Sequence, residues 1–308
     1  MAIRLFIDGA AGTTGLEIRE RLAGRDEFEL IVLDYAKRKD DAARRDALHA
    51  ADIAILCLPD YAAIDAVKMA DGSNTRIIDA SSAHRVAEGW TYGFPELIGH
   101  ETIANARFVS NPGCYPTGFL ALIAPLIRAG LLPADWPYTV NAVSGYSGGG
   151  NALIERFESH PEIAFRTYGL NLAHKHLPEM QEYAGLKHPP VFAPSVVPAY
   201  RGMLVDVPLP LAQISDANAD DLSEALAEFY NASPVMNWCC QVTSETELLI
   251  ETDAPAWDGL RYCVYSNDTM TQARLVARLD NLGKGASGAA IQNLNIMCGL
   301  PETTGLRL

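Results

Sequence analysis

The sequence is poor in the features that mark several protein classes. It holds only six cysteines in 308 residues, with no CxxC pair and no compact spacing: Cys57, Cys114, Cys239, Cys240, Cys263 and Cys298. This excludes a small disulfide-stapled domain, and we expect reduced cysteines in a cytoplasmic protein. The short apolar run before Gly9 does not resemble a signal peptide. No run approaches the roughly 18–20 apolar residues of a membrane span.

Positive charge is also scarce. There are 24 Lys and Arg residues against 38 Asp and Glu, a formal net charge of −14. A phosphate backbone is bound through surplus Lys and Arg, so nucleic acid is excluded as the main partner. A small anionic substrate is compatible with this balance, because a few local cations can hold it. The chain shows no internal repeat, no low-complexity tract and no clear set of metal ligands.

Two patterns divide the chain. Short apolar strands alternate with helices up to residue 113, which is typical of βαβ units and a parallel sheet. Strands are expected there at 3–7, 30–33, 53–58, 76–79 and 108–110. Beyond this point we expect helices at 114–128, 222–230 and 286–298, and longer strands at 139–143, 191–197, 202–208, 239–243 and 261–266. The second part is therefore predicted to be an α+β domain with a mostly antiparallel sheet.

The glycine-rich segment Gly9–Gly15 follows the first strand and opens a helix, as a dinucleotide site requires. Glycines let the backbone approach the pyrophosphate at the helix N-terminus, and Thr13 or Thr14 can cap that helix. The spacing is GxxGxxG instead of GxGxxG, so a plain glycine turn is the alternative. Asp34 suits the ribose of NAD, whereas the basic residues 37–39 suit the 2′-phosphate of NADP. These residues leave NAD and NADP open.

Cys114 lies in the segment Ser-Asn-Pro-Gly-Cys-Tyr-Pro-Thr, where a loop becomes a helix. A helix N-terminus lowers the pKa of a thiol and favours the nucleophilic thiolate. Its backbone N–H groups can also stabilise an oxyanion on an attacked acyl carbon. The alternative is a buried, unreactive cysteine, which is what we expect of Cys57, Cys263 and Cys298.

His174 and His176 stand in the segment His-Lys-His-Leu-Pro-Glu-Met, just before a helix that Pro178 is suited to begin. In an extended segment both rings face the same way. A histidine beside a cysteine thiol is its usual acid or base partner. The alternatives are a metal site or two surface histidines.

Two further segments follow strands. Ser81 to Arg85 stands at the carboxyl end of a parallel strand, where ligands bind in such sheets. Its serines and Arg85 can hold a phosphate or carboxylate. The run Ser144–Gly150 can line the site near the acyl group, or it can be an ordinary loop.

Seven segments, spread over nearly the whole chain, match one family in the family's order. The chain resembles the N-acetyl-gamma-glutamyl-phosphate reductases, in particular their shorter second type. The most specific matches are the segments around Cys114 and His176. The full set is Gly9–Gly15, Asp79–Arg85, Ser110–Thr117, Ser144–Gly150, His174–Met180, Arg201–Met203 and Asp280–Gly288.

The resemblance implies a Rossmann-like α/β domain that binds NADP, formed by residues 1–113 and completed by a C-terminal helix at 284–308. It also implies an α+β catalytic domain of the aspartate-semialdehyde-dehydrogenase type over 114–283. The implied reaction is NADPH-dependent reduction of N-acetyl-gamma-glutamyl phosphate through a Cys114 thioester, with His176 and His174 as acid/base candidates. Cofactor contacts are implied for Gly9, Gly12, Thr13, Gly15 and Gly285, and Ser82, Arg85 and Arg201 are the substrate-binding candidates. We also expect a homo-oligomer.

Three other functions use the same residues. A sibling reductase would act on aspartyl phosphate or an N-acetyl-aminoadipyl phosphate by the same mechanism, in a different pocket. A cysteine hydrolase would use Cys114 and His176 without a nicotinamide. A nucleotide-sensing module would bind the cofactor without turnover, and the presence of both the cysteine and the histidine pair speaks against it.

Overall fold

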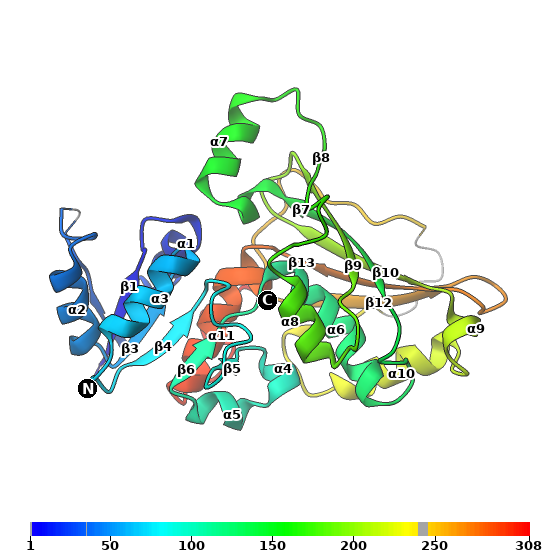
Figure 1. The fold of residues 1–308 in the computed structure, drawn as a ribbon, viewed down its shortest axis with the longest axis horizontal. Coiled ribbons are helices and arrows are strands. Elements are labelled where there is room, and N and C mark those ends of the chain that lie inside the picture. The colour runs from blue at the N-terminus through cyan, green and yellow to red at the C-terminus, as the bar shows by residue number, and fades with distance from the viewer. Residues whose placement is uncertain (1, 35, 240–245) are drawn as a thin grey trace. The chain divides into compact units, whose positions relative to one another are not determined.

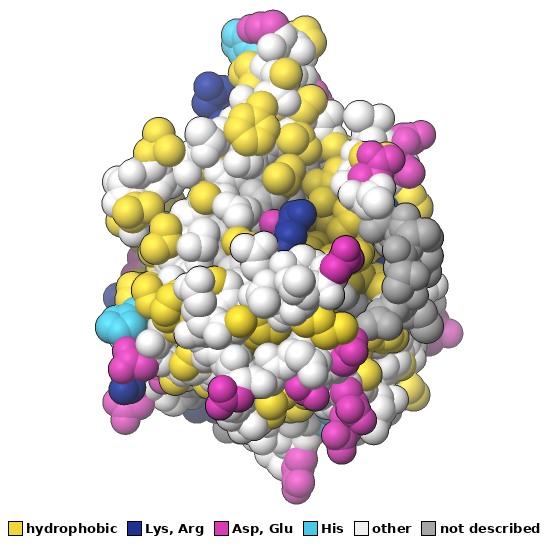
Figure 2. Space-filling view, turned by 90° about the vertical axis from the view of Figure 1, so that its right-hand side faces the viewer, with side chains coloured by type: hydrophobic (Ala, Val, Ile, Leu, Met, Phe, Trp, Pro, Cys, Tyr) yellow, Lys and Arg dark blue, Asp and Glu magenta, His cyan; other side chains and the backbone are white. Residues whose placement is uncertain are grey.

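The computed structural model describes residues 2–34, 36–239 and 246–308. It divides the chain into two compact units. Unit 1 comprises residues 1–112 and 286–306, and unit 2 comprises residues 113–285 with 307–308. None of the described helices has the length and apolarity needed to cross a membrane. Acidic side chains are scattered over the face shown in Figure 2, as the net charge requires.

Unit 1 is built on a parallel sheet, as the sequence predicts (Figure 1). Within its described residues the strand order is β2-β1-β3-β4-β6-β5, and every pairing is parallel. The strands are β1 (Ile3–Asp8), β2 (Phe28–Ile31), β3 (Ile53–Leu56), β4 (Arg76–Asp79), β5 (Thr91–Tyr92) and β6 (Phe108–Ser110). The chain leaves β1 toward β2 on one side and later returns to β3 on the other. This reversal is a topological switch point, and ligands bind at the carboxyl ends of the strands there.

Helices cover both faces of this sheet. One apolar cluster joins β1, β3 and β4 to α1 (Thr13–Leu22), α5 (His100–Asn105) and α11 (Gly288–Met297). A second joins the other face to α2 (Asp41–Ala50) and α3 (Asp60–Met69). The short α4 (Pro95–Ile98) precedes α5. Because both faces are covered, strands such as β3 consist of apolar residues without alternation.

Unit 2 contains a mixed sheet that is mostly antiparallel, as predicted. Its order among the described residues is β11-β12-β13-β10-β7-β9-β8, and only the β11–β12 and β7–β9 pairings are parallel. The strands are β7 (Thr139–Gly145), β8 (Arg166–Thr167), β9 (Val191–Val197), β10 (Met203–Leu209), β11 (Met236–Trp238), β12 (Leu260–Ser266) and β13 (Ala273–Leu279). The sequence prediction missed β13, and residues 240–243 of its strand at 239–243 lie outside the described residues.

One helix, α6 (Cys114–Arg128), forms the centre of unit 2. It packs on β10, β12 and β13, and Gly118 permits the approach: a Cβ there would lie 2.7 Å from a methyl group of Val205. α8 (Leu177–Ala184) and α10 (Ala219–Phe229) pack against α6. The remaining elements are η1 (Tyr146–Gly149), α7 (Asn151–Ser159), α9 (Leu211–Ile214) and the π-helical turn η2 (Gly283–Ser287).

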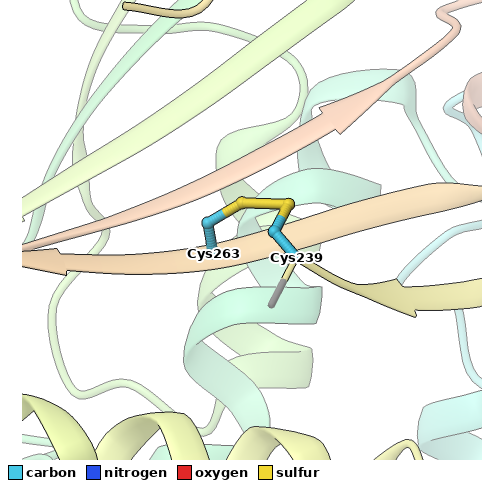
Figure 3. Close-up of a disulfide and its surroundings, with 2 residues drawn as sticks. All are labelled: Cys239 and Cys263. Atoms are coloured by element: carbon cyan, nitrogen blue, oxygen red, sulfur yellow. A yellow bond between two sulfur atoms is a disulfide. The ribbon is translucent and has the colours of Figure 1, made fainter. Parts of the chain in front are cut away.

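A disulfide corrects the expectation that all cysteines are reduced. Cys239, just after β11, is bonded to Cys263 on β12, and their Cα atoms are 5.4 Å apart (Figure 3). The amide of Cys239 also donates to the carbonyl of Tyr262 at 3.1 Å, so strand pairing brings the two cysteines together. The spacing of cysteines along a sequence contains no information about this pairing. Cys263 is buried, as expected, but it is not a thiol.

Candidate active site

A cleft of about 700 Å³ lies in unit 1 at the carboxyl ends of β1 and β3. The turn after β1 lines one side of it with Gly9 and Gly12, and the segment Cys57–Pro59 after β3 lines another. This is the switch point of the sheet, and the volume is that of a small-molecule site. Two of the predicted cofactor glycines therefore line a cavity where a parallel sheet binds ligands.

The three glycines of this turn have different local requirements. Gly9 has φ +87°, and a Cβ there would overlap the carbonyl oxygen of Cys57. A Cβ at Gly15 would lie 2.5 Å from the carbonyl oxygen of Gly9. At Gly12 a Cβ would meet, among the described residues, only the Gly9 oxygen at 3.5 Å, an ordinary contact. The fold therefore needs glycine at 9 and 15, whereas at 12 it leaves open space beside the cleft.

The expectation that Thr13 or Thr14 caps α1 is wrong. The helix begins at Thr13, so both threonines lie inside its first turn and Gly12 takes the N-cap position. No side-chain bond caps this end. The first amide groups of a helix lack intrahelical partners, so this end of α1 can donate hydrogen bonds to an anion.

The charged residues near the cleft favour an anionic group. Arg38 and Lys39 line the cleft, and Asp34 does not. Strand β2 ends at Ile31, earlier than predicted, and Asp34 is exposed beyond it. Asp8, the acid at the end of β1, is paired with Arg44 at 2.8 Å.

Burial distinguishes the cysteines of unit 1 from a reactive thiol. It raises the pKa of Cys57 to about 12 and that of Cys298 to about 11. Both groups therefore remain neutral thiols at neutral pH, as the sequence suggested for these two positions.

Ser82 and Arg85 follow β4 in unit 1. The Ser82 hydroxyl donates to Asp60 at 2.7 Å, and its amide donates to the same carboxylate at 2.9 Å, so this serine fixes the start of α3. Arg85 is buried, and its Nε donates to the carbonyl of Asn111 at 3.0 Å. Asp79, at the end of β4, binds His84 Nδ1 at 2.6 Å, and this orders the loop that carries both candidates.

Cys114 is the first residue of α6, with Gly113 as N-cap. The position is the one predicted, and it places the thiol beside the positive end of a 15-residue helix. Two tyrosines lie near enough for its charge to act on them: Tyr115, which donates to the Ser195 carbonyl at 3.2 Å, and Tyr168, whose hydroxyl is 3.4 Å from that of Tyr115. Burial raises the pKa of Tyr168 to about 12, and the nearby charge of Cys114 adds to this.

The histidine pair lies against the same tyrosines. The ring centroids of His174 and His176 are 4.6 Å apart, and the Tyr115 ring is 6.1 and 5.9 Å from them, respectively. The segment forms a turn and is not extended: the amide of Leu177 donates to the carbonyl of His174 at 3.0 Å. The turn still brings the two rings together. Cys114 and both histidines therefore share one neighbourhood in unit 2.

One hydrogen bond distinguishes the roles that the two histidines can take in proton transfer. The backbone amide of His176 donates to Nδ1 of His174 at 3.2 Å. An N–H group needs a lone pair as acceptor, so neutral His174 carries its proton on Nε2. In this tautomer Nε2 can donate a proton but cannot accept one. His176 is the more buried of the pair, with 6% of its surface exposed.

Two residues near Cys114 extend the predicted set. Glu179, in the first turn of α8, is 1% exposed and accepts the amide of Gly113 at 3.0 Å, which ties the histidine segment to the cysteine loop. Gly285, predicted as a cofactor contact, lies directly against Cys114: a Cβ there would be 2.8 Å from the Cβ of Cys114. The sequence signal for a role of Glu179 was its position three residues after His176. Nothing in the sequence indicated the contact between Gly285 and Cys114.

Arg201 belongs to a second polar cluster of unit 2. Its Nη1 donates to Asp280 at 2.8 Å, so the arginine is held in place by the end of β13. Asn281 accepts the amide of Gly202 at 3.0 Å and donates to Ser147 at 2.8 Å. The segment Ser144–Gly150 is therefore bonded to the Arg201 and Asn281 segments. Among the described residues, no three His, Cys, Asp or Glu side chains are arranged to hold a metal ion.

Comparisons with known proteins agree with these features. Residues 36–106 match the model of the semialdehyde dehydrogenase NAD binding domain, and residues 114–281 match that of the semialdehyde dehydrogenase dimerisation domain. An N-acetyl-gamma-glutamyl-phosphate reductase of Trichormus variabilis is 50% identical, covering 98% of this chain and 99% of its own. One of Brucella ovis is 49% identical, covering 97% and 100%. The chain belongs to this family.

Solved structures with the same fold are aspartate semialdehyde dehydrogenases. That of Vibrio cholerae, complexed with ASA, has a TM-score of 0.71 at 16% identity and covers 97% of this chain and 99% of its own. A probable one from Pseudomonas aeruginosa has a TM-score of 0.72 at 16% identity, with the same coverage. The predicted fold class is thus confirmed, and this N-acetyl-gamma-glutamyl-phosphate reductase family member carries a nicotinamide-binding domain.

Proposed function

We propose that the chain reduces N-acetyl-gamma-glutamyl phosphate to N-acetylglutamate semialdehyde, with release of phosphate and with NADPH as the reductant. The observation that carries the mechanism is the position of Cys114 at the first residue of α6, in one neighbourhood with His174 and His176. Relatives about 50% identical over nearly the whole chain, named N-acetyl-gamma-glutamyl-phosphate reductases, support the substrate.

Unit 1 is the proposed dinucleotide-binding domain, and unit 2 from Cys114 onward the catalytic domain. The open space at Gly12, the uncapped end of α1, and Arg38 with Lys39 fit a dinucleotide with a 2′-phosphate, which supports NADP over NAD. When bound, NADPH supplies the hydride that reduces the acyl group. Thr13 and Gly15 lie in the first turn of α1, directly after Gly12.

Cys114 performs the covalent step. Its thiolate attacks the acyl carbon, the bond to phosphate breaks, and a thioester forms. The first amides of α6 stabilise the oxyanion that develops on the acyl oxygen. After reduction, the thiohemiacetal collapses: its hydroxyl proton passes to His176, the C–S bond breaks with its electron pair going to sulfur, the aldehyde leaves and Cys114 returns as the thiolate. His176 is the acid/base residue of this sequence, and His174 supports it through its Nε2–H group.

Arg85 and Arg201 are the proposed holders of the phosphate and carboxylate groups, with Ser82 beside Arg85. Gly285 leaves Cys114 room to meet the acyl carbon, since a side chain there would press on the nucleophile. A homo-oligomer is supported by the match of residues 114–281 to a dimerisation domain. We place the reaction in the cytoplasm, because NADPH and a labile acyl phosphate are available there. The cysteines do not support a cytoplasmic placement, because Cys239 and Cys263 form a disulfide.

A substrate panel tests the proposal. Purified protein should oxidise N-acetylglutamate semialdehyde with NADP⁺ and phosphate, with a kcat/KM at least tenfold above that for aspartate semialdehyde. NADP⁺ should be preferred over NAD⁺ by a similar factor. A preference for aspartate semialdehyde would assign the chain to a sibling reaction. NADP⁺ binding without turnover of any aldehyde would indicate a sensing module.

A further inference from the structure

A second cavity of unit 2 is lined by three arginines. It encloses about 400 Å³ beside the starts of β10 and β12 and the end of β13, and its cations are Arg261, Arg278 and Arg307. We call it the arginine pocket. Its lining does not include Cys114, His174, His176 or Arg201. The proposed reaction therefore leaves this cluster of positive charge unexplained.

Two of these arginines stand directly opposite each other. β12 and β13 pair in antiparallel register with Arg261 facing Arg278. Like charges directly opposite destabilise a sheet, because their Cβ atoms are only about 4.5–5.5 Å apart. A negative charge beside the pair would offset this repulsion.

The described residues do not supply that compensation. Within 2–34, 36–239 and 246–308, neither Arg261 nor Arg278 forms an ion pair or a side-chain hydrogen bond, and Arg261 lies over the ring of Trp257 at 5.4 Å. Arg274, on the same strand, is paired with Asp206 at 2.7 Å.

The acids of the pocket wall do not balance the arginines. Asp280 lies in the wall, but its carboxylate already accepts Arg201 at 2.8 Å and the amides of Leu282 and Trp257 at 2.9 and 3.3 Å. Glu251, the other acidic side chain of the wall, is exposed, as are Arg261 and Arg307. Arginine side chains thus outnumber acidic side chains in the wall by three to two, on a chain whose net charge is −14.

We propose that the arginine pocket binds a small organic polyanion that carries two or more carboxylates. Adjacent guanidinium groups bind carboxylates through paired N–H donors, and Arg is better suited to this geometry than Lys. The apolar wall, with Ile250, Trp257 and Met203, covers the carbon skeleton of such a ligand. A cavity of this volume is within the range of small-molecule sites.

Occupancy of the pocket is linked to Arg201 through one carboxylate. Asp280 binds both the Trp257 amide in the pocket wall and the guanidinium of Arg201. A ligand that moves Trp257 therefore changes how Arg201 is held. This consequence rests on the proposed role of Arg201 in substrate binding, and would be seen as a change of KM with little change of kcat. The binding itself does not depend on that role.

Calorimetric titration of the full chain with citrate, at saturating NADP⁺, tests the proposal. Wild type should bind one citrate per chain. Arg261→Gln and Arg278→Gln should each weaken binding about tenfold or more, because each removes one bidentate partner. Arg274→Gln, on the same strand, and Arg85→Gln, from the proposed substrate site, should leave the citrate affinity unchanged. The thermal midpoint without citrate checks that each variant is folded.

Several results would overturn the proposal. Equal citrate affinity in wild type and the Arg261→Gln/Arg278→Gln double variant would remove the pocket as the site. Loss of binding in Arg85→Gln would place the citrate in the substrate site. Inorganic phosphate binding as tightly as citrate would exclude an organic ligand class. A lower molar mass of the double variant in sedimentation would show that the arginines pair with a second copy of the chain.

Discussion

Gly9, Gly12 and Gly15 belong to one motif, yet their missing side chains serve different purposes. At 9 and 15 a Cβ would collide with the backbone of the turn, so glycine is required for the chain to fold there. At 12 the fold tolerates a side chain, and the open space lies beside the cleft. The sequence motif treats these positions alike, and only their surroundings in the fold show which glycines the chain needs to fold and which one leaves room for a ligand.

Gly12→Val should weaken NADP⁺ binding by at least tenfold while the thermal midpoint stays near that of wild type. The branched side chain would occupy the space that the pyrophosphate needs. Gly15→Val is the matched comparison and should lower the thermal midpoint strongly, since its Cβ would lie 2.5 Å from the Gly9 oxygen. Fluorescence titration with NADPH measures the affinity. Unchanged affinity in Gly12→Val would remove this turn from the cofactor site.

His176→Ala should reduce kcat by roughly 10²–10⁴-fold, the range for lost general acid–base help. His174→Ala should cost less, because the bond from the His176 amide fixes its tautomer and leaves it a donor only. Steady-state rates of both variants, with NADP⁺ affinity as the control for folding, decide the order. Equal losses, or the larger loss at His174, would reverse the assignment.

Among the helices and strands, the sequence predicts the limits best where residues at the ends of an element determine them. β4, β6 and α6 have the predicted limits, because each begins and ends at a local signal: Asp79 closes an apolar run, and Pro116 and Gly130 bracket the helix. β13 was missed because Ala, Leu and Arg favour helices, and only its partners β12 and β10 make it a strand.

The candidate site shows the same division. The position of Cys114 at a helix N-terminus was predictable from the glycine and proline around it. Three contacts were not: Glu179 with Gly113, Gly285 with Cys114, and Cys239 with Cys263. Each joins residues at least 24 positions apart in sequence, and the periodicity of apolar residues contains no information about such pairs.

The disulfide between β11 and β12 should stabilise unit 2. Closing a loop of this length lowers the entropy of the unfolded chain, an effect of roughly 3–3.5 kcal/mol. Urea unfolding with dithiothreitol, or of Cys239→Ser, should therefore show a lower free energy of unfolding than oxidised wild type. Cys298→Ser, which leaves the bond intact, should still respond to dithiothreitol. Superimposable curves, with six titratable thiols in the denatured protein without reductant, would contradict the bond.

At the scale of the whole molecule, the chain combines two compact units with different sheets. The parallel sheet of unit 1 presents a cleft at its switch point, and the mixed sheet of unit 2 supports the helix that begins at Cys114. Acidic side chains are scattered over the face in Figure 2, and the net charge of −14 leaves anion recognition to a few local cations. The central claim is that these parts perform a phosphate-dependent reaction through a thioester on Cys114.

Reaction of the enzyme with N-acetylglutamate semialdehyde and NADP⁺ in the absence of phosphate tests that claim most directly. The thiol adds to the aldehyde and the hydride is transferred to NADP⁺. The thioester then remains until an acceptor such as phosphate attacks it. We predict a burst of about one NADPH per active site, followed by a stall that phosphate or arsenate relieves. Cys114→Ala should bind NADP⁺ and give no burst. Steady NADPH formation without phosphate or arsenate would mean that water releases the acyl group, and would contradict a phosphate-dependent reductase.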